Sequence, residues 1–386
     1  MHFDIDDFNI IGYIYEKNED GSLIIATRDF LHSAREPAFS QFLESITNII
    51  FEKTGKNIKP YMIETLYISV DSNNKAKVSI NETEIMLYGF SKKEVAVGDA
   101  ISINDIAHIK SLKLCSKNNN ESHKFIFLFN IGWRRGVCFD LHPINIESNT
   151  PMANNNHWIA QSYSFILFTL RLHLDGNSWK YLINNKFFPF ISLNENSIKV
   201  LVNLSKENNK CFDEILAKNI FPDFEKTLVN LKEKWRKNTI IKVESSFIDV
   251  AVERYLAEDY ISCISVIYPR IEKILRLHLS RHSEEPHLRK TYAPKNLSDS
   301  IQLNISETSY PHTPLLTARF SHYLECCFFE SFNANSFEEK INRNSVGHGV
   351  ASVEYFNRKY STIAFLIIDQ LYYYLNADGK DCIIKL

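Results

Sequence analysis

The N-terminal part of the chain shows the apolar and polar alternation of β-strands. Residues 63–80, IETLYISVDSNNKAKVSI, alternate on both sides of an Asn-rich turn, and residues 124–141, KFIFLFNIGWRRGVCFDL, contain two apolar runs around two glycines. Upstream of both, residues 37–55 place apolar side chains at helical spacing and stop at Gly55, a residue type at which helices commonly end. The pattern predicts an α+β domain over residues 1–147, with a mainly antiparallel sheet and at least one helix.

A polar, Asn-rich stretch at residues 145–157 indicates the next boundary. The apolar run that follows, WIAQSYSFILFTLRLHL, predicts a buried helix, and amphipathic helical patterns continue beyond it. We therefore predict a mostly helical connecting region over residues 148–243 and a separate domain over residues 244–386.

Residues 244–386 have the pattern of a helical bundle. Four helices are predicted, within SSFIDVAVERYLAEDY, DYISCISVIYPRIEKILRLHLSR, PLLTARFSHYLECCFFESF and YFNRKYSTIAFLIIDQLYYYL. A loop rich in Ser, Pro and Asn separates the second from the third, and four helices with one long connection are typical of a bundle. The predicted fold class is α+β multidomain, with an N-terminal α+β domain followed by an all-α bundle.

Composition and charge narrow the function classes only a little. The chain has 386 residues, of which 45% are hydrophobic, so a folded protein with more than one domain is expected. A formal charge of −2 gives no overall attraction to nucleic acid, although a local basic face can still bind it. The acidic start, MHFDIDDFNI, lacks the order of a secretory signal, and the apolar runs are too short to span a membrane, so we expect a cytoplasmic protein. Seven Cys without a CxxC pair predict neither a disulfide framework nor a structural zinc site.

Basic side chains gather in two places outside the last domain. The first is an amphipathic helix predicted within residues 223–242, and its basic residues include Lys232, Lys234, Arg236 and Lys237. The second is the predicted hairpin, where Arg134 and Arg135 follow Trp133 and offer phosphate binding and stacking. Both clusters are candidate RNA contacts, and in both a solvated surface is the alternative.

One segment, EEKINRNSVGHGVA at residues 338–351, concentrates polar side chains ahead of the last predicted helix. Arg343 and His348 are five positions apart, which on a regular helix separates them by roughly 140°. They converge if Arg343 lies just before a helix and His348 lies in its first turn. Three neighbouring residues, Asn342, Asn344 and Ser345, can cap that helix. Two glycines, Gly347 and Gly349, leave space around the His side chain.

The same segment also has an ordinary structural interpretation. Asn, Ser and Gly before an apolar helix are what many helix starts contain. In that case Arg343 pairs with Glu338 or Glu339, and His348 is a structural histidine.

The run Arg343-Asn344-Ser345-Val346-Gly347-His348, followed by Gly349, resembles the signature of the HEPN superfamily, an Arg followed by a polar residue and, a few positions later, a His. Its placement is also similar to that in HEPN bundles. It lies before the last long helix of a helical segment and after a helix pair that contains EDYISCIS and RIEKILR. The resemblance covers residues from about 245 to 386.

The resemblance implies a metal-independent endoribonuclease whose site forms when two bundles pair. Many HEPN proteins are toxins or phage-defence (abortive infection) proteins that cut tRNA or other cellular RNA. The expected partners are therefore RNA, a second copy bound through the C-terminal bundle, and a trigger or neutralising protein, with no cofactor or metal. The N-terminal domain is expected to sense the trigger or to present RNA.

The residue roles that we expect follow from their chemistry. His348 accepts the proton of a ribose 2′-hydroxyl, and Arg343 stabilises the charge that develops on the phosphorane. Asn344 orients a phosphate oxygen or the His. Glu272 orients Arg343, and Ser345 supports the helix start.

Two other functions stay open at this point. One is a non-catalytic HEPN-fold module that dimerises or binds nucleotide. The other is a metal-dependent hydrolase that uses His278 and His282, which are four positions apart on one helical face.

Overall fold

The structure is a computed structural model. It describes residues 1–8, 13–17, 19–21, 23–26, 37–70, 73–82, 85–114, 124–130, 136–141, 160–161, 163–165, 167–207, 211–281, 292–302, 314–331, 340–376 and 382–385. The chain divides into two compact units. The N-terminal unit comprises Met1–Gly89, Ile109–Leu167 and Ile383–Leu386, and the helical unit comprises Phe90–His108 and Phe168–Cys382.

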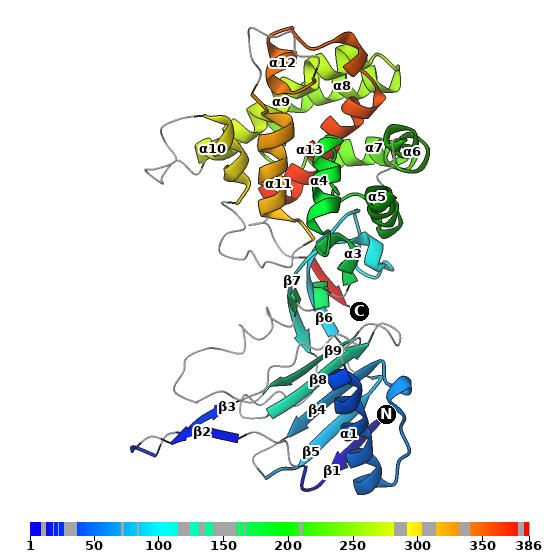
Figure 1. The fold of residues 1–386 in the computed structure, drawn as a ribbon, viewed down its shortest axis with the longest axis vertical. Coiled ribbons are helices and arrows are strands. Elements are labelled where there is room, and N and C mark those ends of the chain that lie inside the picture. The colour runs from blue at the N-terminus through cyan, green and yellow to red at the C-terminus, as the bar shows by residue number, and fades with distance from the viewer. Residues whose placement is uncertain are drawn as a thin grey trace. The chain divides into compact units, whose positions relative to one another are not determined.

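A five-stranded antiparallel sheet forms the centre of the N-terminal unit (Figure 1). Its strand order is β1-β5-β4-β8-β9, and the strands are β1 (His2–Ile5), β5 (Ala76–Ile80), β4 (Thr65–Val70), β8 (Lys124–Asn130) and β9 (Gly136–Leu141). Both predicted strand pairs are present in antiparallel register, with Val70 opposite Ala76 and Phe125 opposite Leu141. A separate hairpin is formed by β2 (Tyr13–Lys17) and β3 (Leu23–Ala26). The predicted antiparallel sheet is thereby confirmed.

Helix α1 (Pro37–Thr54) supplies the other half of this unit's core. Its apolar stripe packs against the alternate residues that β4 and β5 direct to one face of the sheet; the buried set includes Phe39, Leu43, Ile46, Ile50, Leu66, Ile68, Val78 and Ile80. The helix ends where expected, because Gly55 has φ +70°, a left-handed conformation that favours glycine.

Three further strands form a second sheet of order β10-β6-β7. They are β6 (Ile85–Ser91), β7 (Ile106–Leu114) and β10 (Cys382–Lys385). The division of the chain into its two units passes through these three strands.

The helical unit contains the helices of both the predicted connecting region and the predicted bundle. The former are α3 (Thr169–Leu172), α4 (Gly176–Asn184), α5 (Glu195–Glu207), α6 (Phe212–Asn219) and α7 (Phe221–Trp235). The latter are α8 (Ser245–Leu256), α9 (Tyr260–Arg281), α10 (Pro294–Asp299), α11 (Thr317–Tyr323) with a π-helical turn at Leu324–Phe328, α12 (Arg343–Gly347) and α13 (Arg358–Leu375). Short 3₁₀ turns occur at Pro60–Met62, Ile103–Asp105, Ile241–Glu244, Ser300–Gln302 and Val353–Tyr355. Residues 168–243 and 244–382 belong to one compact unit with one continuous hydrophobic core.

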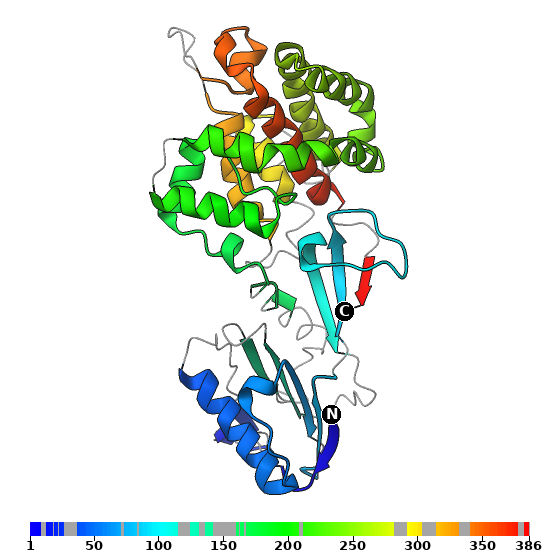
Figure 2. The ribbon, with the colours of Figure 1, turned by 90° about the vertical axis from the view of Figure 1, so that its right-hand side faces the viewer.

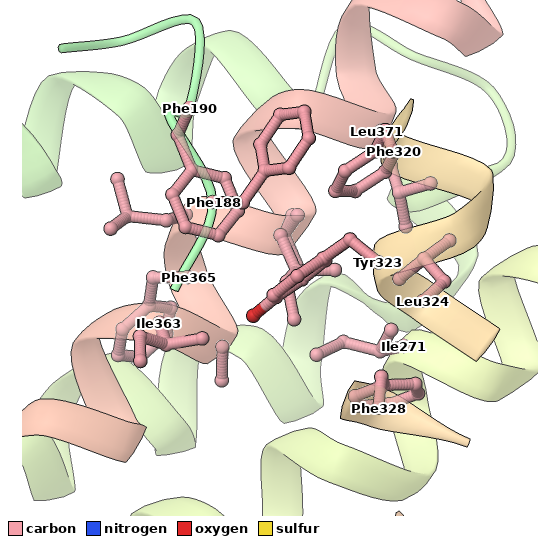
Figure 3. Close-up of a cluster of buried hydrophobic side chains, with 14 of the residues drawn as sticks. Phe188, Phe190, Ile271, Phe320, Tyr323, Leu324, Phe328, Ile363, Phe365 and Leu371 are labelled. Atoms are coloured by element: carbon pink, nitrogen blue, oxygen red, sulfur yellow. The ribbon is translucent and has the colours of Figure 1, made fainter. Parts of the chain in front are cut away.

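Helix α13 lies in the middle of that core (Figure 2). It is buried on all sides over most of its length, as a helix surrounded by other helices must be. Aromatic side chains fill the space beside it, and Figure 3 shows Phe188 and Phe190 meeting Phe320 and Tyr323. The ring centroids of Phe188 and Phe320 are 5.0 Å apart, an edge-to-face contact. Among the described residues, none of the helices has both the length and the apolar character needed to cross a membrane.

Candidate active site

Helix α12 carries the polar segment, and its start is built by Asn342 and Ser345. The Asn342 side chain accepts a hydrogen bond from the backbone N–H of Ser345 at 2.8 Å, and the Ser345 hydroxyl accepts one from the Asn342 N–H at 2.9 Å. This reciprocal pair is a capping box, and both residues are buried. Of the three predicted caps, Asn342 is therefore the one used, and Ser345 supports it.

Replacing Asn342 by alanine is expected to destabilise the protein by about 1–2 kcal/mol, because the first turn of α12 loses its cap. Thermal denaturation of the purified protein measures the effect. Asn219→Ala is the control, since this exposed side chain donates to the carbonyl of Ile215 in its own helix. Equal melting temperatures for the two variants would contradict a capping role for Asn342.

Arg343 is the first residue of α12, and a carboxylate from α9 holds its guanidinium. Its Nε forms an ion pair with Oε2 of Glu272, which is 5% exposed. Its Nη1 donates to Oδ1 of Asn344 at 3.1 Å. The other oxygen of Glu272, Oε1, accepts a hydrogen bond from Nε of Arg276 at 2.7 Å and forms an ion pair with Nη2 of the same residue at 2.6 Å. The predicted pairing of Glu272 with Arg343 is present, whereas Glu338 and Glu339 lie outside the described residues.

His348 ends α12 instead of starting it. It is the C-cap of this five-residue helix, and its N–H donates to the carbonyl of Asn344 at 2.9 Å. The expected geometry, with Arg343 before the helix and His348 in its first turn, is therefore wrong. Across this short helix, Nη1 of Arg343 lies 3.8 Å from where a side chain on Gly347 would begin. The guanidinium thus runs alongside the residue that precedes His348.

The side chains of this segment differ in exposure. His348 is exposed, and the side chain of Arg343 is 30% exposed, so both can meet a solute. Gly349 has φ +69° and turns the chain away from the helix, a conformation that residues with a Cβ rarely adopt. The segment therefore presents a fixed cation and an imidazole with little side-chain bulk around them.

Asn344 connects the segment to the end of the π-helical turn. Its Nδ2 donates to the carbonyl of Glu330 at 3.2 Å, while its Oδ1 accepts from Arg343. The Glu330 carboxylate pairs with Lys186 at 2.5 Å and with Lys340 at 3.7 Å. Because two cations hold this carboxylate, it does not oppose an anion at Arg343.

The chemistry available here follows from these groups. Arg343 carries a positive charge and can bind a phosphate oxygen, and the His348 imidazole has nitrogen atoms that can accept or donate a proton. Comparisons with protein-family models, with curated proteins and with solved structures find no match. The functional interpretation therefore depends on the residues and their geometry.

The amphipathic helix α7 does not present the basic surface that was predicted. Lys234 is 6% exposed, and its Nζ lies 2.6 Å from Oδ1 of the fully buried Asp369. Its assignment as an RNA contact is wrong, because the apolar face that carries Trp235 also takes Lys234 into the core.

The remaining basic residues of this cluster are largely paired with carboxylates. Arg236 pairs with Glu233 and Asp249, Lys232 lies 3.5 Å from Asp249, and Lys237 pairs with Glu94. Arg134 and Arg135 of the hairpin lie outside the described residues.

The histidines proposed for a metal site have another environment. His278 is buried, and its Nε2 is 3.0 Å from the carbonyl oxygen of Ser300, while His282 lies outside the described residues. In the part of the chain that the structure describes, no three His, Cys, Asp or Glu residues gather closely enough to hold a metal ion. The hydrolase alternative loses its support from His278.

A thiol and an imidazole also meet where α11 continues into the π-helical turn. Cys326 Sγ lies 3.5 Å from the His322 ring. Burial and the nearby Glu325 carboxylate raise the pKa of the Cys326 thiol. A thiol with a raised pKa stays protonated at neutral pH, so this pair does not have the properties of an activated nucleophile.

Arg276 also belongs to the candidate site, although it is not among the site residues predicted from the sequence. Its guanidinium shares Glu272 with Arg343, and the signal for it is local, because Glu272 and Arg276 have the i,i+4 spacing of a helical ion pair.

Proposed function

We propose that this protein is a metal-independent endoribonuclease of the HEPN type. The observation that carries the proposal is the arrangement on α12, where Arg343, oriented by the buried Glu272, lies alongside Gly347, the residue that precedes the exposed His348 in the chain. A fixed cation and an imidazole in one short segment are the two groups that cleavage of a phosphodiester by its own 2′-hydroxyl requires.

In the proposed reaction His348 takes the proton from a ribose 2′-hydroxyl, and the 2′-oxygen attacks the adjacent phosphorus. Charge accumulates on the phosphorane oxygens, where Arg343 stabilises it. Asn344, which is bonded to Arg343, keeps the guanidinium plane in place. The bond to the 5′-oxygen breaks, which leaves a 2′,3′-cyclic phosphate and a 5′-hydroxyl.

The leaving 5′-oxygen needs a proton, and one His cannot readily accept and donate a proton in the same step. A second copy of the chain, paired through the helical unit, would bring a second His348 to the same phosphate. The proposed assembly is therefore a homodimer. A cytoplasmic toxin or phage-defence role, with RNA such as tRNA as the substrate and a trigger or neutralising protein as a regulator, follows from the family resemblance.

The test is to map and characterise RNA ends after brief expression of the protein, and then with purified protein in buffer that contains EDTA. We expect new 5′-hydroxyl ends that pair with 2′,3′-cyclic phosphate ends, and their loss in Arg343→Ala. Asn219→Ala, which is remote in sequence from α12, should cleave like the wild type. Cleavage that persists in both Arg343→Ala and His348→Ala would refute the ribonuclease assignment. Absence of cleavage by a dimeric wild-type protein would favour a non-catalytic module.

A further inference from the structure

The carboxylate of Glu272 holds two guanidinium groups, and only one of them has a role in the proposed reaction. Oε2 pairs with Arg343, and Oε1 accepts a hydrogen bond from Nε of Arg276 at 2.7 Å and forms an ion pair with its Nη2 at 2.6 Å. Two fixed cations share one carboxylate, which leaves a net positive charge at this end of the site. The side chain of Arg276 is 40% exposed, so this charge reaches the surface.

An exposed aromatic ring lies beside Arg276. The guanidinium carbon of Arg276 is 4.8 Å from the centroid of the Tyr292 ring, and Tyr292 is 49% exposed. Because half of the Tyr292 surface is in water, burial contributes little stabilisation at that position. Contact with Arg276 restricts the orientation of the Tyr292 ring. Aromatic rings next to arginines are the elements with which proteins hold single-stranded RNA, because a base stacks on the ring and a phosphate binds the cation.

A chain of contacts links the Tyr292 ring to helix α12. Tyr292 contacts Arg276, Arg276 and Arg343 share Glu272, and Arg343 lies alongside Gly347, which precedes His348. Both oxygens of one buried carboxylate fix the two guanidinium groups, so their separation is set before RNA binds.

We infer that Arg276 and Tyr292 form a nucleotide subsite next to the scissile phosphate. Arg276 binds the neighbouring phosphate of a single-stranded RNA, and Tyr292 stacks on the base of that nucleotide. The inference rests on the proposed function because that function places the scissile phosphate at Arg343. It adds a preference for unpaired RNA, since a base within a duplex does not expose its face to a tyrosine.

Binding tests the subsite separately from catalysis. All variants are made in the full chain with His348→Ala, so that cleavage does not interfere. The probe is a fluorescein-labelled, mixed-sequence, single-stranded RNA of about 12 nucleotides, within the usual range of single-strand sites. We expect Tyr292→Ala to weaken binding by roughly 5-fold to 100-fold, and Tyr292→Phe, which keeps the stacking ring, to bind within about twofold of the parent.

Arg276→Ala should weaken binding and also reduce the slope of log affinity against log salt concentration by about 0.7, because one phosphate contact is lost. Tyr292→Ala should leave that slope unchanged. An arginine that only supports Glu272 would not change the slope. Lys226→Ala is the control for charge, since Lys226 is exposed on α7 and lies 3.4 Å from Asp223. Tyr292 is exposed, so its variants remain decisive even if Arg276→Ala lowers stability.

Each outcome supports or overturns the subsite. It is overturned if Arg276→Ala and Tyr292→Ala bind the RNA as tightly as the parent, or if the parent does not bind it. Wild-type cleavage together with unchanged binding in these variants would refute the subsite alone. Weakened binding together with a wild-type protein that does not cleave would refute the proposed reaction and the position of the subsite beside a scissile phosphate, and would show that Arg276 and Tyr292 bind RNA. Equal binding of a duplex of the same sequence would overturn the preference for unpaired RNA.

Discussion

Replacing His348 by alanine is expected to lower the rate of RNA cleavage by roughly 10²- to 10⁴-fold, the usual contribution of one general acid or base. The fold should be unaffected. His348 is exposed, and its backbone N–H, which alanine retains, donates a hydrogen bond to the carbonyl of Asn344 in α12. Single-turnover cleavage of a labelled RNA measures the loss.

The matched control is His322→Ala, which removes another exposed imidazole from the helical unit. The His322 ring contacts the Cys326 thiol, whose pKa is raised, and we expect the His322→Ala variant to cleave at the wild-type rate. If both variants lose activity equally, the loss is not specific to α12. If His348→Ala cleaves within tenfold of the wild type, His348 is not the base.

Arg343→Lys provides a graded version of the same test. Lysine keeps the charge but not the planar fork that pairs with Glu272 and Asn344, so the variant should fall between the wild type and Arg343→Ala. Equal cleavage rates for Arg343→Lys and the wild type would show that a positive charge is sufficient at this position and that the planar guanidinium is not required.

Local patterns predicted those parts of the fold that local forces determine. Helix α1 and the strand pairs of the N-terminal sheet were recognisable because their periodicity and their turn residues lie close together in the chain. The site segment was recognisable for the same reason, since Asn342, Arg343 and His348 are near neighbours. The end of the helix within that segment could not be predicted in this way, because α12 stops after five residues, where Gly349 adopts φ +69°.

The basic helix shows where a local pattern is insufficient. Lys234 belongs to a run of charges that looks solvated, yet its position is decided by Asp369 on α13. The sequence signal for the burial of Lys234 lies on α13, the helix that carries Asp369. A single carboxylate within the apolar run AFLIIDQLYYYL predicts that a cation or a donor must be found for it.

That buried pair provides the second large effect. Lys234→Met should destabilise the helical unit by about 3–5 kcal/mol, because it leaves the Asp369 carboxylate buried without its cation. Asp369 is fully buried, and its Oδ1 also accepts a hydrogen bond from Trp235 Nε1 at 2.8 Å. Urea unfolding followed by tryptophan fluorescence measures the change.

Two further variants show whether the cost comes from the orphaned charge. Adding Asp369→Leu to Lys234→Met should restore part of the lost stability, since the double variant buries no charge and the two effects are not additive. Lys226→Ala, from an exposed pair, should change stability by no more than about 0.5 kcal/mol. A double variant that is less stable than Lys234→Met would show that the pair is not the source of the cost.

The same variant separates a structural lysine from an RNA ligand. A lysine that contacts RNA would, when replaced by methionine, weaken RNA binding and leave the unfolding transition unchanged. The burial of Lys234 and its 2.6 Å contact with Asp369 predict the opposite for Lys234→Met, a lower unfolding midpoint and, at temperatures where the variant is folded, unchanged RNA binding. Arg276→Ala should weaken RNA binding through its exposed guanidinium. The two substitutions therefore distinguish the charge of Lys234, which stabilises the fold, from the charge of Arg276, which is proposed to bind RNA.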